Sequence, residues 1–391
     1  MMTEKLYYTA PKRFEWKTAV TEKVERDGKK LVKLKETAFY PEGGGQPSDE
    51  GTINDLEIRG LLEENEDVYH IVSVFPTTNE VTCKLNSSRR IDHMQHHSGQ
   101  HLLSAVCMEL FDFHTESFHL GSDTVTIDLS TTQISAEQMK QIEEKANQYI
   151  FENRNIHTFF AQQHELADLP LRKLPDVTEN IRIVQIAGID TSACCGTHVE
   201  RTGEIGILKL MKTEKQKGRI RLHFKCGFRA LADYQTSLDT VQITSQFFQT
   251  SKTDIPSRLQ ALDQETKLLQ KENEQLKADN AAFIAEKIGN EQQAQFVHNL
   301  FEKKSLKELQ MIAARLLESG RSYVLLASLD ERCVFLSQKG TLHCGTLFKE
   351  YLSFFKGKGG GNEKQAQAKF DDSAETERFF LHMIEKIDQL L

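Results

Sequence analysis

Hydrophobic and polar residues alternate in short runs through residues 1–88. The alternation over residues 18–24 is followed by Asp27-Gly28, a pair typical of hairpin turns, and it resumes over residues 29–34. Further short strands are predicted at residues 51–62, 68–74 and 80–85, and short strands separated by turns predict a small β-barrel. Residues 39–49 interrupt the pattern with three glycines between two prolines, which predicts a loop whose backbone can approach a ligand closely.

Helical and strand periodicities then alternate along the chain. Helices are predicted over residues 91–109 and 135–153, and strands at residues 124–129, 181–186, 205–211 and 220–225. Residues 241–290 predict one long amphipathic helix, in which apolar residues recur every seventh position and polar residues occupy most of the companion positions. This heptad pattern fits either an internal helical hairpin or a homodimer. Residues 300–391 again alternate helix and strand around a glycine-rich segment at 357–368.

These patterns predict an α+β fold with four parts. They are a small β-barrel over residues 1–88, an α+β domain over residues 89–240, a helical, coiled-coil-like linker over residues 241–298 and an α/β domain over residues 299–391. No apolar run approaches the ~20 residues of a membrane-spanning helix. The seven cysteines are too sparse for a disulfide framework, which favours a reducing, cytoplasmic location.

The formal net charge of -8 argues weakly against a nucleic-acid partner, but positive charge gathers between residues 209 and 229. Eight basic residues stand there against a single acid, Glu214: Lys209, Lys212, Lys215, Lys217, Arg219, Arg221, Lys225 and Arg229. Such a stripe is either a solvated strand and loop or a surface that contacts phosphates.

Histidine and cysteine spacing predicts a metal site. His93, His97 and His101 follow one another at intervals of four, which places imidazoles on one face of a helix, and any two of them could bind one zinc ion. Cys194 and His198 repeat the same spacing a hundred residues later, and a thiolate with an imidazole suits zinc. The alternative is that these histidines are ordinary core or surface residues.

Several motifs resemble one known family. The segments at residues 97–103, 194–199 and 202–206 resemble the editing domain of alanyl-tRNA synthetase. The glycine loop at 39–47 and residues 218–224 are similar to the stand-alone, AlaX-type alanyl-tRNA editing proteins, and residues 357–368 resemble the DHH-associated domain that ends the synthetases. The resemblance covers nearly the whole chain, in the same order of parts, and identifies it with the long form of these editing proteins.

The resemblance implies specific roles for individual residues. It assigns one zinc ion to His97, His101, Cys194 and His198, and catalytic roles to Gln46, His97 and His101. The residues expected at the substrate are Gly43, Gly44, Gly45, Gln46, Thr197, Arg219 and Arg221. The residues expected to contact tRNA are Lys212, Lys215, Lys217, Lys358, Gly359, Gly360 and Gly361. One departure is Cys195, which stands where the synthetases usually carry glycine; an adjacent side chain on an extended backbone should point away from the metal.

The implied activity is hydrolysis of tRNA(Ala) mischarged with serine or glycine, in trans, because residues 1–391 contain no ATP-binding aminoacylation segment. A pocket built for alanine discriminates weakly against these two amino acids, so a second, hydrolytic site has a purpose. The alternative is a zinc-stabilised tRNA-binding protein without activity. A metallopeptidase is disfavoured because Ser98, not glutamate, follows His97, and a DHH phosphoesterase because Asp92 is followed by His93-Met94.

Overall fold

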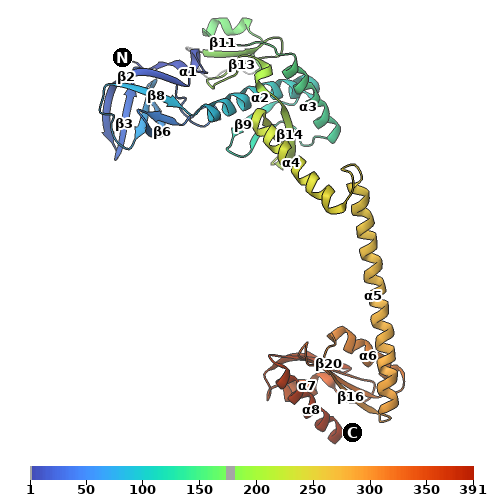
Figure 1. Ribbon diagram of the computed structural model, residues 1–391. Helices are drawn as coiled ribbons and strands as arrows, with labels where there is room; N and C mark the ends of the chain where they lie inside the picture. The colour runs from blue at the N-terminus through green and yellow to red at the C-terminus, as the bar shows by residue number, and fades with distance from the viewer. Residues whose placement is uncertain (1, 173–180) are drawn as a thin grey trace. The chain divides into compact units, whose positions relative to one another are not determined.

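The computed structural model describes residues 2–172 and 181–391, which form two compact units, Met1–Ile243 and Thr244–Leu391 (Figure 1). Both units mix helices with β-sheets, so the α+β class is as predicted. The finer division into four domains stays a prediction. Across the described residues, no helix combines the length and apolar character needed to cross a bilayer.

Six strands of the first unit close into a barrel in the order β2-β3-β7-β6-β5-β8. Their bounds are β2 Glu15–Arg26, β3 Lys29–Leu34, β5 Gly51–Ile53, β6 Leu56–Glu64, β7 Asp67–Val72 and β8 Glu80–Leu85. The β2–β3 turn has positive φ at both Asp27 (51°) and Gly28 (71°), as a tight hairpin turn requires. Strand β1 (Glu4–Lys5) pairs in parallel with β4 (Glu36–Thr37), and the short helix α1 (Leu6–Thr9) follows β1.

Helix α2 (Ser87–Phe111) is the central element of the first unit. The Asn86 side chain caps its first turn, and nearly every residue from His93 to Cys107 is buried, so its histidines lie in the protein interior. An antiparallel sheet, β14-β15-β10-β9, packs against α2 through one continuous hydrophobic core. Its strands are β9 Thr115–Leu120, β10 Val125–Leu129, β14 Leu208–Gln216 and β15 Arg219–Cys226.

A second sheet of this unit, β11-β12-β13, leads into the loop that begins at Cys194. Its strands are β11 Ile156–Ala161, β12 Ile181–Ile186 and β13 Asp190–Ala193. Helix α3 (Ala136–Phe151) begins with a capping box between Ser135 and Gln138 and contributes Ile142, Ala146 and Ile150 to the core, as its periodicity predicts. Two short 3-10 helices, Gln163–Asp168 and Thr202–Ile205, complete the unit.

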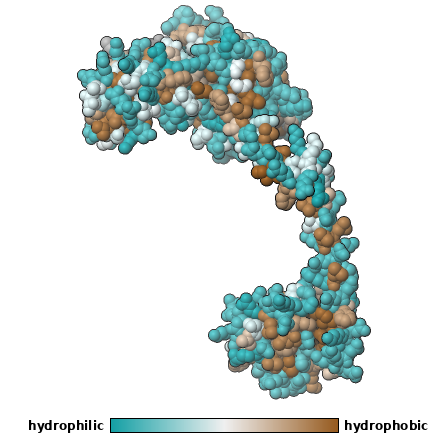
Figure 2. Space-filling model, in the orientation of Figure 1, coloured by the Kyte–Doolittle hydropathy of each residue, from teal (hydrophilic) through white to brown (hydrophobic). Residues whose placement is uncertain are grey.

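The prediction of one continuous helix over residues 241–290 is wrong. Helix α4 (Gly227–Phe248) ends before Gln249, which takes a left-handed φ of 49°, and α5 (Ile255–Glu291) starts anew with Pro256 in its first turn. Apolar heptad residues of α5 remain exposed, among them Leu262 (39%), Leu269 (59%) and Leu276 (61%). Figure 2 shows such hydrophobic residues, in brown, along the helical segment.

The second unit is a five-stranded mixed sheet, β16-β17-β18-β20-β19, between two helical layers. The strands are β16 Phe296–Phe301, β17 Tyr323–Ser328, β18 Cys333–Gln338, β19 Gly357–Gly361 and β20 Gln365–Phe370. The end of α5 and α6 (Leu306–Glu318) pack on one face, while α7 (Cys344–Leu352) and α8 (Ser373–Leu390) pack on the other. The glycine-rich segment thus contains the edge strand β19 and the start of the neighbouring strand β20.

Candidate metal centre

Four side chains from two distant stretches of the chain meet inside the first unit. His97 and His101 lie one turn apart on α2, and Cys194 and His198 come from the loop that follows β13. One ligand atom from each lies within 4.8 Å of the others. The Cys194 sulfur is 3.3 Å from the Nε2 atoms of both His97 and His198. These are the four predicted metal ligands, and the group they form could hold a metal ion.

A second set of side chains orients each imidazole. The Nδ1 atom of His97 is 2.9 Å from the Gln46 amide oxygen, that of His198 is 3.1 Å from the Ser98 hydroxyl, and that of His101 is 3.2 Å from the Asp190 carboxylate. Because Nδ1 is engaged outside the group in all three cases, Nε2 is the nitrogen that can face an ion. Such outer contacts fix the tautomer and ring orientation of metal-binding histidines.

Asp190 is the outer residue that sequence reasoning missed. The side chain of Asp190 is 1% exposed, accepts a hydrogen bond from the Ser192 hydroxyl at 2.9 Å and forms an ion pair with Arg172 at 3.1 Å. The residue lies 89 positions from His101, so no local spacing connects the two. The only signal in the sequence is an acid at the start of a strand, just upstream of the Cys194 loop.

The loop that carries Cys194 is held by a buried arginine and a glycine. Arg182 donates to the carbonyl oxygens of Cys194 and Gly196 at 2.8 and 2.9 Å. A Cβ atom at Gly196 would lie 2.1 Å from Cε1 of His97, so only glycine leaves room for that ring. The spacing of Cys194 and His198 alone predicts neither the contacts with Arg182 nor the steric need for glycine at position 196.

The electrostatics of the group favour a cation. Burial would raise the pKa of the Cys194 thiol, but the surrounding histidines outweigh it and hold that pKa well below its ordinary value. Burial lowers the pKa of His101, yet the Cys194 sulfur and Asp190 carboxylate outweigh it and raise the value to about 9. Burial dominates at His198 and lowers its pKa to about 3. A cysteine thiolate together with imidazole nitrogens is the donor set that zinc takes, so the residues fit this ion.

The glycine loop docks beside the same group. Gly43 and Gln46 exchange backbone hydrogen bonds of 3.1 and 2.9 Å, while Gly44 and Gly45 have φ of 56° and 80°. The Gln46 side chain is fully buried: its amide nitrogen donates to the Thr197 hydroxyl at 2.9 Å and its oxygen accepts from the Thr197 N–H at 3.1 Å. Because the same amide oxygen also contacts Nδ1 of His97, Gln46 is placed to orient that imidazole.

The remaining histidines and the second cysteine lie outside the ligand group. His96 is structural, since its Nδ1 donates to the Asp92 carbonyl at 2.8 Å and its Nε2 accepts from the Cys226 N–H at 3.0 Å. His93 is buried as well, and burial lowers its pKa to about 3. Cys195 is exposed, and its thiol lies near the Tyr8 hydroxyl.

The basic stripe is largely neutralised, by Glu214 within the stripe and by acids from other elements that its local sequence does not reveal. Arg221 forms two hydrogen bonds with Asp128, at 2.7 and 2.9 Å, Arg219 pairs with Glu116, and Lys212 lies 2.5 Å from Glu214. Lys215 and Lys217 are exposed near the turn between β14 and β15.

Comparison with known proteins gives consistent matches. A family model described as the threonyl and alanyl tRNA synthetase second additional domain matches residues 181–223, which include Cys194 and His198. The alanyl-tRNA editing protein Aarsd1-A of Xenopus laevis is 33% identical over 79% of this chain and 78% of its own length. The alanyl-tRNA editing protein AlaX-L of Pyrococcus horikoshii is 30% identical over 99% of this chain and 98% of its own length. The alanine–tRNA ligase of Methanobrevibacter smithii is 31% identical over 93% of this chain but 44% of the ligase.

Proposed function

We propose that this chain, which belongs to the family of alanyl-tRNA editing proteins, hydrolyses the ester between a wrongly attached amino acid and tRNA(Ala). Serine and glycine are the proposed amino acids, since an alanine pocket rejects them poorly. The observation that supports hydrolysis most directly is the convergence of His97, His101, Cys194 and His198.

One zinc ion is the proposed cofactor, held by these four residues. When bound, zinc can polarise a carbonyl or lower the pKa of a bound water. Four protein ligands usually make a closed structural site, whereas catalysis needs an open position. X-ray absorption of the zinc-loaded protein would decide between the two: four ligands with no added water or substrate would rule out direct metal catalysis.

The surrounding residues supply orientation and hydrogen bonds. The Gln46 amide oxygen accepts a hydrogen bond from Nδ1 of His97, and its amide nitrogen donates to the Thr197 hydroxyl. The Gly43–Gly45 loop is fixed at one end by its own turn and at the other by the Gly45 carbonyl, which accepts from the Leu120 N–H at 3.2 Å. We expect backbone N–H groups of this loop to donate to the oxygen that gains negative charge as the ester is attacked.

A deacylation assay tests this proposal. The protein should release serine or glycine from Ser-tRNA(Ala) or Gly-tRNA(Ala) but leave Ala-tRNA(Ala) intact, and a chelator should stop the reaction. The variant His101→Ala should lose activity while its circular dichroism spectrum is unchanged. Tight tRNA binding without release of the amino acid would favour the alternative, a non-catalytic zinc-stabilised tRNA-binding protein.

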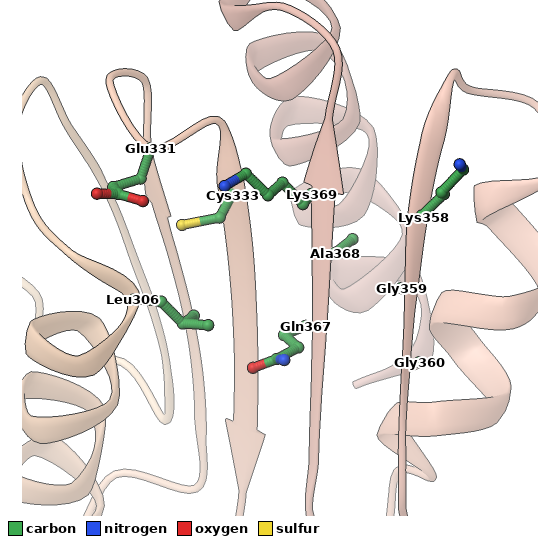
Figure 3. A pocket seen from close by; sticks show the side chains of 9 residues that line it. All are labelled: Leu306, Glu331, Cys333, Lys358, Gly359, Gly360, Gln367, Ala368 and Lys369. Atoms are coloured by element: carbon green, nitrogen blue, oxygen red, sulfur yellow. The ribbon is translucent and has the colours of Figure 1, made fainter. Parts of the chain in front are cut away.

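For tRNA contact in the second unit, we propose the glycine strand β19. It borders a cavity of about 420 Å³ lined by Lys358, Gly359, Gly360, Gln367 and Lys369, among others (Figure 3). Lys358 and Lys369 are directly opposed in the β19–β20 pairing, and both line the cavity together with one acid, Glu331. Phosphates of tRNA are the anions that we expect these two lysines to contact.

A homodimer is the proposed assembly, through the exposed heptad residues of α5. Leu262 and Leu269 are 39% and 59% exposed, and burial of both against a second copy would remove this apolar surface from water. Sedimentation of the protein should show a dimer that the substitution Leu269→Lys dissociates. A monomer at all concentrations would refute this assembly.

A further inference from the structure

An exposed aromatic strand leads to the edge of the metal centre, from elements that the proposed chemistry does not use. Strand β11 is the outer strand of its sheet, and its four central residues are exposed. Two of them, Phe159 (36%) and Phe160 (54%), are neighbours in the strand, so their rings lie on opposite faces of the sheet. Phe160 therefore keeps about half of its surface in contact with water.

Tyr8 connects this strand to the metal-binding loop. Its ring meets that of Phe160 edge to face, with 5.9 Å between centroids and an interplanar angle of 79°. The Arg182 guanidinium lies 5.0 Å from the centroid of the Tyr8 ring. The same arginine donates to the carbonyl of the proposed metal ligand Cys194 at 2.8 Å, and the thiol of the neighbouring Cys195 lies near the Tyr8 hydroxyl.

A chain of side-chain contacts therefore links the exposed strand to the loop that carries the proposed metal ligands. It passes from Phe160, through Tyr8 and the buried guanidinium of Arg182, to the backbone carbonyl of Cys194. Tyr8 comes from α1 and Phe160 from β11, more than 150 positions apart, so the fold, not local sequence, builds the arrangement. Single-stranded RNA is recognised in this way, by bases stacked on aromatic rings and arginine planes.

We propose that Phe160 and Tyr8 form a stacking platform for the unpaired 3′-terminal nucleotides of the tRNA, which guides the aminoacyl ester to the metal centre. This inference rests on the proposed function. The platform acts on binding and positioning; it takes no part in bond cleavage.

The test compares Phe160→Ala with Phe151→Ala in the full-length, zinc-loaded protein. Phe151 is 83% exposed at the end of α3, so its loss is a matched control for the removal of a surface phenylalanine. With Ser-tRNA(Ala), Phe160→Ala should raise KM about tenfold, which corresponds to ~1.4 kcal/mol of stacking, while kcat changes less than threefold. Phe160→Trp should restore the wild-type KM because it keeps a stacking surface.

A second substrate separates the platform from a structural role. Seryl-adenosine carries the same ester but lacks the upstream nucleotides, so Phe160→Ala and wild type should hydrolyse it with the same kcat/KM. An equal loss on both substrates, or equal KM values for Phe160→Ala and Phe151→Ala with tRNA, would overturn the platform. A wild-type protein that releases no serine at all would instead refute the proposed function, so the two failures are distinguishable.

Discussion

Asp190 shows how one residue outside the ligand set can govern metal affinity. Its carboxylate accepts from His101 Nδ1 and is itself held by Arg172 and Ser192. The negative charge makes the imidazole a stronger base and fixes the ring so that Nε2 faces the other ligands. The charge is therefore part of the metal site although no atom of Asp190 would touch the ion.

We predict that Asp190→Asn lowers zinc affinity by about 10- to 100-fold, because the amide keeps the shape of the side chain but not its charge. Competition with a chromophoric chelator measures this directly. Asp128→Asn is the control: that acid is also buried and paired with an arginine, Arg221, but in a different sheet. Equal zinc affinities for the two variants would show that zinc binding does not depend on a carboxylate hydrogen-bonded to His101.

At the scale of elements, the barrel contains its own pH-sensitive group. His70 on β7 is fully buried; its Nδ1 donates to the Val32 carbonyl at 3.0 Å and its Nε2 lies 2.9 Å from the Thr37 hydroxyl. Burial lowers the pKa of His70 to about 4, from about 6.5 in the unfolded chain. The unfolded state therefore takes up a proton first as the pH falls below 6.5.

Because the folded pKa is depressed, the stability contribution is complete above pH 6.5 and declines towards pH 4. We predict that wild type loses about 1.6 kcal/mol more unfolding free energy between pH 6.5 and 5 than His70→Gln does. Urea titrations followed by the fluorescence of Trp16, the single tryptophan and a residue of the barrel core, report this unit. Parallel pH profiles for the two proteins would mean that His70 does not titrate in this range.

The β14–β15 hairpin presents two kinds of lysine. Lys209 and Lys225 are paired with Glu143 and Asp233, whereas Lys215 and Lys217 lie exposed near the turn. We predict that the double substitution Lys215→Ala/Lys217→Ala weakens tRNA binding and lowers the slope of log K against log salt by about 2. Lys209→Ala/Lys225→Ala should leave that slope nearly unchanged. Filter binding over a range of salt concentrations checks both, and equal slopes for the two doubles would exclude the hairpin turn as a phosphate contact.

At the scale of the whole molecule, what the sequence predicted and what it missed have a common physical cause. Local periodicity located most helices and strands, and the interval of four between His97 and His101, and between Cys194 and His198, identified the ligand pairs. Helix breaks that depend on a single left-handed residue, such as Gln249, escape a heptad pattern. Local periodicity also gives no information on contacts between elements: it predicts neither the Asp190 carboxylate beside His101 nor Asp128, the acid that pairs with Arg221 of the basic stripe.

The two units have different proposed functions: the first binds the metal ion and cleaves the ester, and the second contacts tRNA. The metal group and the hydrophobic core around α2 belong entirely to Met1–Ile243, while the cores on either side of the second sheet are built from residues 281–387. A chain that ends at Phe248, the last residue of α4, leaves every member of the first core in place.

We predict that this shortened chain binds one zinc ion and hydrolyses seryl-adenosine with the full-length kcat/KM, because no ligand or outer residue of the site is removed. Its KM for Ser-tRNA(Ala) should rise at least tenfold, since the glycine strand and its two lysines are lost with residues 249–391. Zinc content, circular dichroism and steady-state kinetics on both substrates test the division. An unchanged KM for tRNA would assign the second unit to assembly alone, because phosphate contacts made by β19 would then contribute nothing to substrate binding.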